Sequence, residues 1–200
     1  MVDQVQRRVP AVPSLEWLTA LPPATRFAFN GDAAARAAAH PVWGVEFSEE
    51  ACRANAHSTR ATLWMGPDEY LLLDFATWEP SPGRPPAGQP LATASASTLF
   101  DTLEGAMAGV PHALVDISHR QFAFQMGGPH SATILSGACP LDLDLAEFPV
   151  GMCTRTALAK ADITLWRTRT DHFHLEVWRS FAGYVTGVLT EIAAEFYPTR

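Results

Sequence analysis

Two short apolar runs, residues 113–117 and 122–126, constrain the fold of this chain more than any other stretch. Only four polar residues separate the runs, and this spacing is the sequence form of a β-hairpin with a short loop. Gly-Gly-Pro ends the second run, and residues 131–138 then place apolar side chains at helical spacing before Cys139-Pro140 ends the pattern. These features predict a ββα unit in the middle of the chain.

The C-terminal part of the chain has a similar pattern. Residues 161–167 and 172–178 alternate apolar and polar side chains around a turn, and Ser180 precedes a final amphipathic helix that it is expected to cap. A shift of 51 residues superimposes the apolar positions of the two units: Phe122 falls on Phe173, Phe124 on Leu175, Met126 on Val177 and Ile134 on Val185. This weak repeat predicts an α+β fold with two ββα-like units, in which helices cover one face of antiparallel sheets.

Shorter signals predict the remaining elements. Asp32 caps an alanine-rich helix at residues 33–39 that Pro41 ends, and residues 97–108 form an amphipathic helix. The other predicted strands are short apolar or alternating runs at residues 26–30, 42–47, 60–64 and 69–75. The last two runs flank a Gly-Pro-Asp turn and form a hairpin.

A proline-rich stretch divides the chain. Residues 78–90 contain five prolines and two glycines, too many for a helix or a central strand, so we predict a surface loop and a boundary between two halves. The predicted organisation is an N-terminal arm at residues 1–22, a first α+β half at 23–78, a Pro-rich loop at 79–96 and a second α+β half at 97–200.

The charge of the chain limits its partners. The formal net charge is −7 and lysine occurs once, so the clustered cations of a nucleic-acid surface are not expected. The three cysteines form no CxxC pair, and neither a membrane-length apolar run nor the apolar core of a signal peptide occurs. We expect a cytoplasmic protein that binds neither nucleic acid nor membrane.

The residue pattern contains no catalytic set and no metal-binding set. His172 and His174 share one strand face, but no third ligand lies at a useful spacing, so exposed histidines are the favoured interpretation. Cys139 and Cys153 lack a neighbouring base and are interpreted as buried small hydrophobic residues. The Gly-Gly-Pro at 127–129 lacks the further glycines or the lysine of a nucleotide-binding loop.

The predicted loop between the two central strands carries a small charged cluster. His119 and Arg120 follow Asp116 closely, and they form either a turn-stabilising ion pair, which is the favoured interpretation, or a site for an anionic group.

Four side chains are candidates for contacts with a partner. Arg167 and Arg169 share one strand face, which suits either solvent, the favoured interpretation, or an acidic partner. Six tryptophans exceed what the core of a 200-residue chain needs, and aromatic residues are enriched at the centres of interfaces. Trp17 in the arm and Trp78 beside the Pro-rich loop are therefore interface candidates.

Several motifs between residues 60 and 196 occur in the order and spacing of a known family. They are Asp-Ile-Ser-His-Arg-Gln at 116–121, Gly-Ala-Cys-Pro-Leu-Asp-Leu at 137–143, Phe-Pro-Val-Gly at 148–151, Arg-Thr at 155–156 and Arg-Ser-Phe-Ala-Gly-Tyr-Val at 179–185. Together they resemble the gamma subunit of heterotetrameric sarcosine oxidase.

The resemblance implies a fold, a complex and a role. The fold is expected to be similar to the α+β, folate-binding aminomethyltransferase type. The implied partners are an alpha subunit that binds NAD and tetrahydrofolate, a beta subunit that binds FAD and FMN, and a zinc-binding delta subunit. That complex oxidises sarcosine with O2 to glycine and hydrogen peroxide and passes the one-carbon unit to tetrahydrofolate. This chain is expected to hold no cofactor, to be non-catalytic alone and to support assembly.

The sequence is compatible with other functions as well. The same resemblance is compatible with a subunit of a related complex that oxidises another N-methyl amino acid. A stand-alone folate-binding or aminomethyltransferase-like protein would need a carboxylate and aromatic rings around a pterin, for which Asp116, Tyr70 and Tyr184 are the candidates. A generic interaction protein is the third alternative.

Overall fold

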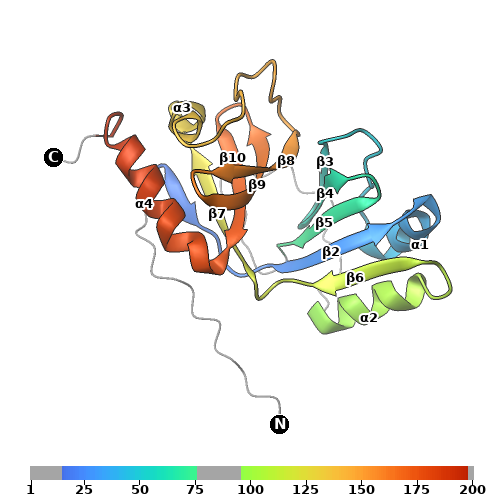
Figure 1. Cartoon of the computed structure of the whole chain (residues 1–200). Helices are drawn as coiled ribbons and strands as arrows, with labels where there is room; N and C mark the ends of the chain where they lie inside the picture. Colours follow the sequence, from blue (N-terminus) through green and yellow to red (C-terminus); the bar gives the residue numbers. More distant parts are fainter. Residues whose placement is uncertain (1–14, 76–95, 198–200) are drawn as a thin grey trace, which may run out of the picture.

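Two antiparallel sheets stand next to each other, each covered by its own helices (Figure 1). The computed structural model describes residues 15–75 and 96–197. Within these residues each sheet has five strands, and we call them the first sheet, in the order β3-β4-β5-β2-β6, and the second sheet, in the order β1-β7-β10-β9-β8. The predicted α+β class is confirmed.

The first half is continuous in the chain. Its elements are β2 (Thr25–Gly31), α1 (Ala33–Trp43), β3 (Ala54–His57), β4 (Arg60–Gly66), β5 (Glu69–Asp74), α2 (Ala96–Ala106) and β6 (His112–Asp116). The predicted hairpin at 60–75 is confirmed, because β4 and β5 pair directly. The Pro-rich loop predicted at 79–96 lies almost entirely outside the described residues.

The second half follows the same order of elements. It contains β7 (Gln121–Gly127), α3 (Ser131–Ser136), β8 (Cys153–Leu158), β9 (Ala161–Arg169), β10 (His172–Trp178), the 3-10 turn η1 (Arg179–Phe181) and α4 (Ala182–Ala193). One of its two edge strands is β1 (Leu18–Ala20), which pairs with β7 as β6 pairs with β2. The predicted hairpin at 161–178 is confirmed as β9 and β10.

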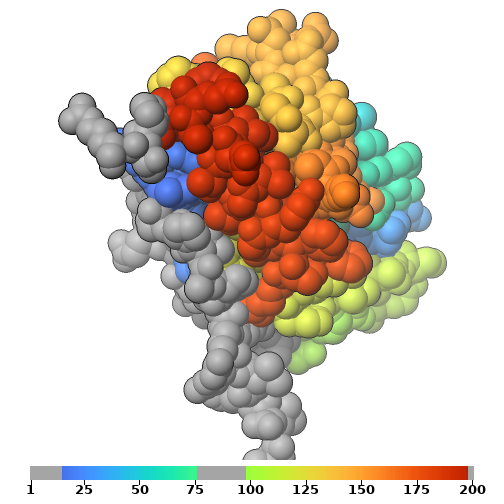
Figure 2. All heavy atoms as spheres, turned by 60° about the vertical axis from the view of Figure 1, so that its left-hand side comes forward, coloured from blue at the N-terminus to red at the C-terminus, as the bar shows by residue number. Residues whose placement is uncertain are grey.

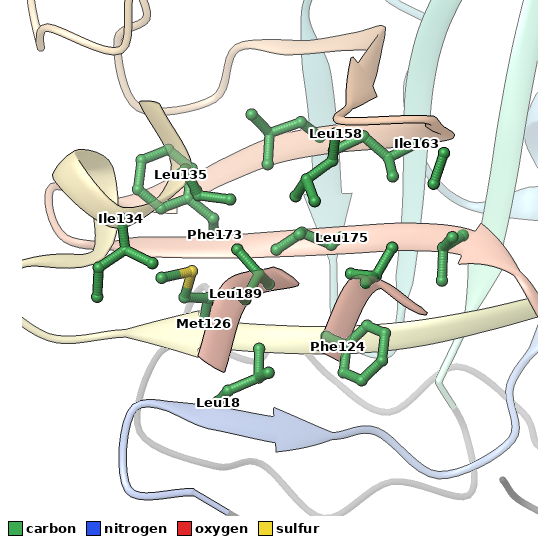
Figure 3. Close-up of a cluster of buried hydrophobic side chains, with 14 of the residues drawn as sticks. Leu18, Phe124, Met126, Ile134, Leu135, Leu158, Ile163, Phe173, Leu175 and Leu189 are labelled. Atoms are coloured by element: carbon green, nitrogen blue, oxygen red, sulfur yellow. The ribbon is translucent and has the colours of Figure 1, made fainter. Parts of the chain in front are cut away.

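Each sheet packs one face against its own helices. In the first half, Phe27 and Phe29 of β2 lie under α1 and α2. In the second half, alternate side chains of β7 and β10 pack against α3 and α4, and Figure 3 shows Phe124, Leu175 and Leu189 in this cluster. A third cluster lies between the two sheets and combines apolar residues of both: Ala61, Leu63, Leu71 and Leu73 from the first, and Cys153 and Trp166 from the second. The helices therefore lie outside and the sheets face each other.

The central hairpin prediction is wrong. The two apolar runs are β6 and β7, but β6 pairs with β2 in the first sheet and β7 pairs with β1 and β10 in the second. Residues 117–120 are the crossover between the halves, and the N–H of Ile117 donates to the carbonyl of Arg26. A short polar linker between two apolar runs fits a hairpin and a crossover equally well, because pairing partners distant in sequence decide between them.

The predicted repeat and domain boundaries change accordingly. β7 and β10, superimposed by the shift of 51 residues, are neighbours within one sheet, with Phe124 opposite Leu175. The repeat in the fold is longer than predicted. The elements between β2 and α2 correspond, in the same order, to the elements between β7 and α4. The predicted second half begins at residue 97, whereas α2 and β6 belong to the first half. Residues 18–20, predicted as part of the arm, belong to the second sheet.

Local signals at the helix ends were partly misleading. Asp32 caps α1 as predicted, with its Oδ1 accepting from the N–H groups of Ala34 and Ala35. However, the helix includes Pro41 and continues to Trp43, so the strand predicted at 42–47 is wrong. Trp43 is fully buried and its Nε1 donates to Thr62 Oγ1 at 2.8 Å, and this packing overrides the local proline signal. Ser180 makes no capping bond, because η1 precedes α4.

No helix among residues 15–75 and 96–197 is long and apolar enough to cross a membrane.

Candidate functional site

A cavity of about 450 Å³ lies between the two halves. β2, β4 and β5 of the first sheet, β8, β9 and β10 of the second, and the crossover between the sheets all contribute to its wall. Its lining includes apolar side chains such as Met65, Leu71 and Ile163, and its charged lining residues are Arg120, Arg155, Asp162 and Glu176. The volume is in the range of small-molecule sites, so the cavity is the candidate site of the described chain.

A buried ion pair joins the two sheets at this cavity. Arg26 of β2 and Glu176 of β10 are 2% and 1% exposed, and Arg26 Nε donates to Glu176 Oε2 at 2.6 Å. The second carboxylate oxygen accepts from His174 Nε2 at 2.8 Å. Arg26 also donates from Nη1 to the carbonyl of Ala24 at 3.0 Å, and its backbone N–H donates to Ser118 Oγ in the crossover at 2.9 Å.

The electrostatics of the pair keep Glu176 ionised. Burial alone would raise the pKa of this carboxyl group, but the positive charge of Arg26 and the hydrogen bonds from His174 and Arg26 outweigh it, so the pKa is lowered. A carboxylate with both oxygens engaged is poorly suited to exchange protons with a substrate. The group therefore acts as a link between the sheets.

Two further cationic side chains lie around the cavity. Arg155 of β8 forms a two-pronged ion pair with Glu69 of β5, in which Nη1 donates to Oε2 at 3.1 Å and Nη2 donates to Oε1. The guanidinium of Arg120 in the crossover lies over the ring of Trp178 at 5.3 Å from its centroid. Each of these contacts connects a segment of one half to a segment of the other or to the crossover.

Two of the three cysteines, Cys139 and Cys153, are buried. Burial raises the pKa of the Cys153 thiol to about 12, so it is a thiol at neutral pH. Cys139 is buried and contacts Thr156 Oγ1. Both are buried small side chains, as predicted. Among the described residues no group of three His, Cys, Asp or Glu side chains is arranged to hold a metal ion.

The three residues predicted for a folate pocket do not converge. Asp116 is exposed, and its Oδ1 accepts from the N–H of Ser118 at 2.8 Å. Tyr70 contributes to the cavity wall, but its ring is buried under Phe29 and Phe47 and its hydroxyl donates to a backbone carbonyl. Tyr184 lies on α4 in the second half and does not line the cavity.

Two of the four partner-contact candidates are buried in the chain itself. Arg167 is buried rather than on a solvent or partner face, and its guanidinium donates to the carbonyls of Leu143 and Phe148 and lies over a phenylalanine ring. These bonds link β9 to the segment between α3 and β8. Trp17 is 6% exposed and its ring stacks on Tyr197, because β1 brings Trp17 and Leu18 into the second core.

Nothing in the described structure tests the other two partner-contact candidates, Arg169 and Trp78. Arg169 is exposed at the end of β9, and Trp78 lies outside the described residues. Their interface roles stay predictions.

The histidine predictions are half right. His172 is partly exposed, and its Nδ1 lies 2.6 Å from an Asp171 carboxylate oxygen. His174 is buried and hydrogen-bonded to Glu176, so the exposed interpretation is wrong for this residue. In the crossover, Arg120 stacks on Trp178, and the carbonyl of His119 accepts from Arg179.

Sequence reasoning missed the Arg26–Glu176 pair. Both residues alternate with apolar neighbours, and such a pattern is typical of a strand with one solvent-facing side. Here the polar side of each strand faces the opposite sheet. The signal that could have found the pair is that the polar sides of these two strands carry charges of opposite sign, Arg26 on β2 and Glu176 on β10.

The fold places the chain in a class of two-part α+β proteins. Aminomethyltransferase T of the glycine cleavage system from Bartonella henselae superimposes on 86% of this chain and 44% of its own length, with a TM-score of 0.58 and 13% identity. At this level of identity the likeness shows the fold alone, and the predicted aminomethyltransferase-type fold is confirmed.

The particular family follows from the sequence. The profile described as "Sarcosine oxidase, gamma subunit family" matches residues 87–195, so the chain belongs to this family and the predicted resemblance is confirmed. It is 32% identical to the sarcosine oxidase subunit gamma of Corynebacterium sp. strain U-96 over 139 residues, which is 70% of this chain and 58% of that protein. A protein of the same name from Arthrobacter sp. is 28% identical over 143 residues, which is 72% of this chain and 61% of its own length.

A solved structure agrees with the sequence relatives. A chain of the heterotetrameric sarcosine oxidase from Corynebacterium sp. U-96, in complex with pyrrole 2-carboxylate, superimposes with a TM-score of 0.75 and 25% identity. The match covers 96% of this chain and 92% of that chain. The matched part spans less than two thirds of the length of the curated relatives.

Proposed function

We propose that this chain is the non-catalytic gamma subunit of a heterotetrameric sarcosine oxidase and supports assembly of the complex. The observation that carries the proposal is the family match across residues 87–195. The character of the cavity agrees with it, because the buried Glu176 is fully engaged by Arg26 and His174 and the buried thiol of Cys153 has a raised pKa. Such a wall suits a structural module.

The proposal extends to the other members of the complex. Alpha, beta and delta subunits are the partners, and they carry FAD, FMN, NAD, tetrahydrofolate and zinc, while this chain carries none of these groups. The complex converts sarcosine and O2 to glycine, hydrogen peroxide and a folate-bound one-carbon unit in the cytoplasm. A complex acting on another N-methyl amino acid is the variant of this proposal in which only the substrate differs.

Co-expression tests the proposal. The chain, carrying an affinity tag, is produced together with the other three subunits and purified through the tag. We expect all four subunits to elute together, with sarcosine-dependent peroxide formation in the complex. The chain produced alone is expected to show no flavin absorbance and no turnover. Turnover by the lone chain, or recovery of no partner subunit, would contradict the proposal, and a panel of N-methyl amino acids identifies the substrate.

A second candidate function is a stand-alone folate-binding protein. The cavity between the halves favours it, because it has the volume of a small-molecule site and lies between two α+β units of an aminomethyltransferase-type fold. The failure of Asp116, Tyr70 and Tyr184 to converge makes it the weaker candidate. Calorimetry of the lone chain with tetrahydrofolate separates the two functions, since saturable binding supports the second one.

A further inference from the structure

Three large aromatic side chains lie exposed where β10 passes into α4. Trp178 is 47% exposed, and Phe181 and Tyr184 are each 39% exposed. The rings of Phe181 and Tyr184 meet edge to face with centroids 6.2 Å apart. Ala182 and Val185, on the other side of the same turns, are buried in the second core. The outward rings are therefore surplus to the packing of this chain.

The crossover between the halves lies against these rings. Arg120 stacks on Trp178, the N–H of Arg179 donates to the carbonyl of Arg120 at 2.9 Å, and the N–H of Arg120 donates to the carbonyl of Ile117 at 3.0 Å. We call residues 117–120 and 178–184 the crossover surface. Figure 2 shows α4 lying across the outer side of the second half, with no other described element over it. Because its backbone is hydrogen-bonded, this surface loses little conformational entropy when a partner binds.

The charge of the crossover surface differs from that of the chain. The chain has a formal net charge of −7, yet residues 117–120 and 178–184 contain two arginines and a histidine, and the one carboxylate directly before them, that of Asp116, accepts the N–H of Ser118. The adjoining cavity is balanced in charge, because Asp162 and Glu176 line it together with Arg120 and Arg155. Tryptophan, tyrosine and arginine are the residues that most often carry binding energy at protein interfaces.

We infer that the crossover surface docks this chain onto an acidic, partly apolar surface of another subunit of the complex. The inference rests on the proposed function and adds the location of the contact and the chemistry of the partner. Three exposed rings call for apolar recipient sites, and the cations around them call for carboxylates that are complementary in charge. A second copy of this chain is a poorer occupant, because it would bring the same cations face to face.

Gly183 allows a test that leaves the fold intact. It lies between Phe181 and Tyr184, and a Cβ built on it meets no atom within 4 Å. Gly105 of α2 has the same open surroundings and serves as the matched control in the first half. We expect Gly183→Glu to lower recovery of the partner subunits by about tenfold or more, and Gly183→Lys to lower it less, because only glutamate repels an acidic partner. Gly105→Glu is expected to leave recovery unchanged.

Thermal melts and a second variant show whether a loss of recovery comes from the surface itself. Thermal melts of the lone variants should show no loss of stability, since replacing a helical glycine raises helix propensity. The double variant Phe181→Ser, Tyr184→Ser should reproduce the loss of recovery without a change of charge.

Equal recovery for all variants and wild type would overturn the inference while leaving the proposed function intact. A wild-type chain that dimerises alone, and a Gly183→Glu chain that does not, would assign the surface to self-association and also overturn it. If the wild type recovers no subunit, the proposed function fails and the inference with it.

Discussion

The two halves have the same order of strands but obtain their edge strands differently. In the first half, β6 follows α2 in the chain and pairs with β2. In the second half, the equivalent place beside β7 is taken by β1, which precedes the whole first half. The first sheet is thus built from one continuous segment, whereas the second is completed by residues about a hundred positions away from its partner strand. The halves are therefore alike in architecture but are not separable pieces of chain.

Two buried ion pairs differ in their position: one lies within the first half, and the other joins the two halves. Arg60 and Asp74 pair inside the first half, between β4 and β5, with Nε and Oδ2 2.9 Å apart. Arg26 and Glu176 pair between the halves. Both pairs are almost fully buried, so removal of one partner leaves a charge with little solvation. Variants of the two pairs can therefore distinguish the loss of stability that comes from an unpaired buried charge from the loss that comes from a broken link between the halves.

The largest expected effect is that of Glu176→Gln. Removing this charge leaves Arg26 buried without its counter-ion, and we expect the free energy of unfolding to fall by about 3–5 kcal/mol. Asp74→Asn is expected to cost a similar amount within the first half. The comparison predicts that only Glu176→Gln splits denaturant unfolding into separate transitions for the two halves, followed by tryptophan fluorescence and circular dichroism. Coincident transitions for both variants would show that the pair does not couple the halves.

The same pair predicts how stability depends on pH. Because the pKa of Glu176 is lowered in the folded chain, its contribution is complete above the ordinary carboxyl pKa of 4.5 and is lost as the pH falls through the lowered value. The stability difference between wild type and Glu176→Gln should therefore shrink on acidification below that ordinary value. Urea titrations at a series of acid pH values measure it, and a constant difference would contradict the assignment of the shift.

The next largest effect tests the borrowed edge strand. Leu18 of β1 is fully buried in the second core, and Leu18→Ala is expected to cost about 2–5 kcal/mol, as other buried leucine truncations do. Leu145 is 45% exposed, and Leu145→Ala should change stability by about 0.5 kcal/mol or less. Equal effects in chemical denaturation would mean that residues 18–20 are not an integral part of the second half.

Local elements of this fold were predictable, while their assembly was not. Alternation and turn residues revealed the hairpins of β4 with β5 and of β9 with β10, because both partners of each pair are close in sequence. The runs at 113–117 and 122–126 were recognised as strands but assigned to each other. Their true partners, β2 and β10, lie far along the chain, and the local pattern carries no information about such pairing.

The candidate site was predictable to a smaller extent. Arg120 and His119 were singled out as a cluster, and the structure places them in the crossover surface. The Trp178 ring under Arg120 and the link between Arg26 and Glu176 were missed, since each depends on the way one half packs against the other. Arg167 was misassigned for the same reason: alternation within β9 could not show that the segment between α3 and β8 covers it.

A smaller effect compares the starts of helices in the two halves. α1 of the first half begins at Asp32, which accepts two backbone N–H groups, so Asp32→Ala is expected to cost about 1 kcal/mol. α4 of the second half begins after η1 without a side-chain cap, so Ser180→Ala should change stability by about 0.5 kcal/mol or less. Thermal melts of both variants measure the difference. A larger loss for Ser180→Ala than for Asp32→Ala would contradict the capping geometry.

The smallest effect concerns the exposed counterpart of the link between Arg26 and Glu176. Arg155 and Glu69 also join the two sheets, but their side chains are 57% and 33% exposed, so water and salt screen their attraction. A double-mutant cycle with Arg155→Ala and Glu69→Ala is expected to give a coupling energy of less than about 1 kcal/mol, and less still at high salt. The cycle removes the separate effects of each truncation, which a single variant would not. A coupling energy as large as the loss in Glu176→Gln would mean that contact across the cavity, rather than burial, determines how strongly a charge pair holds the halves together.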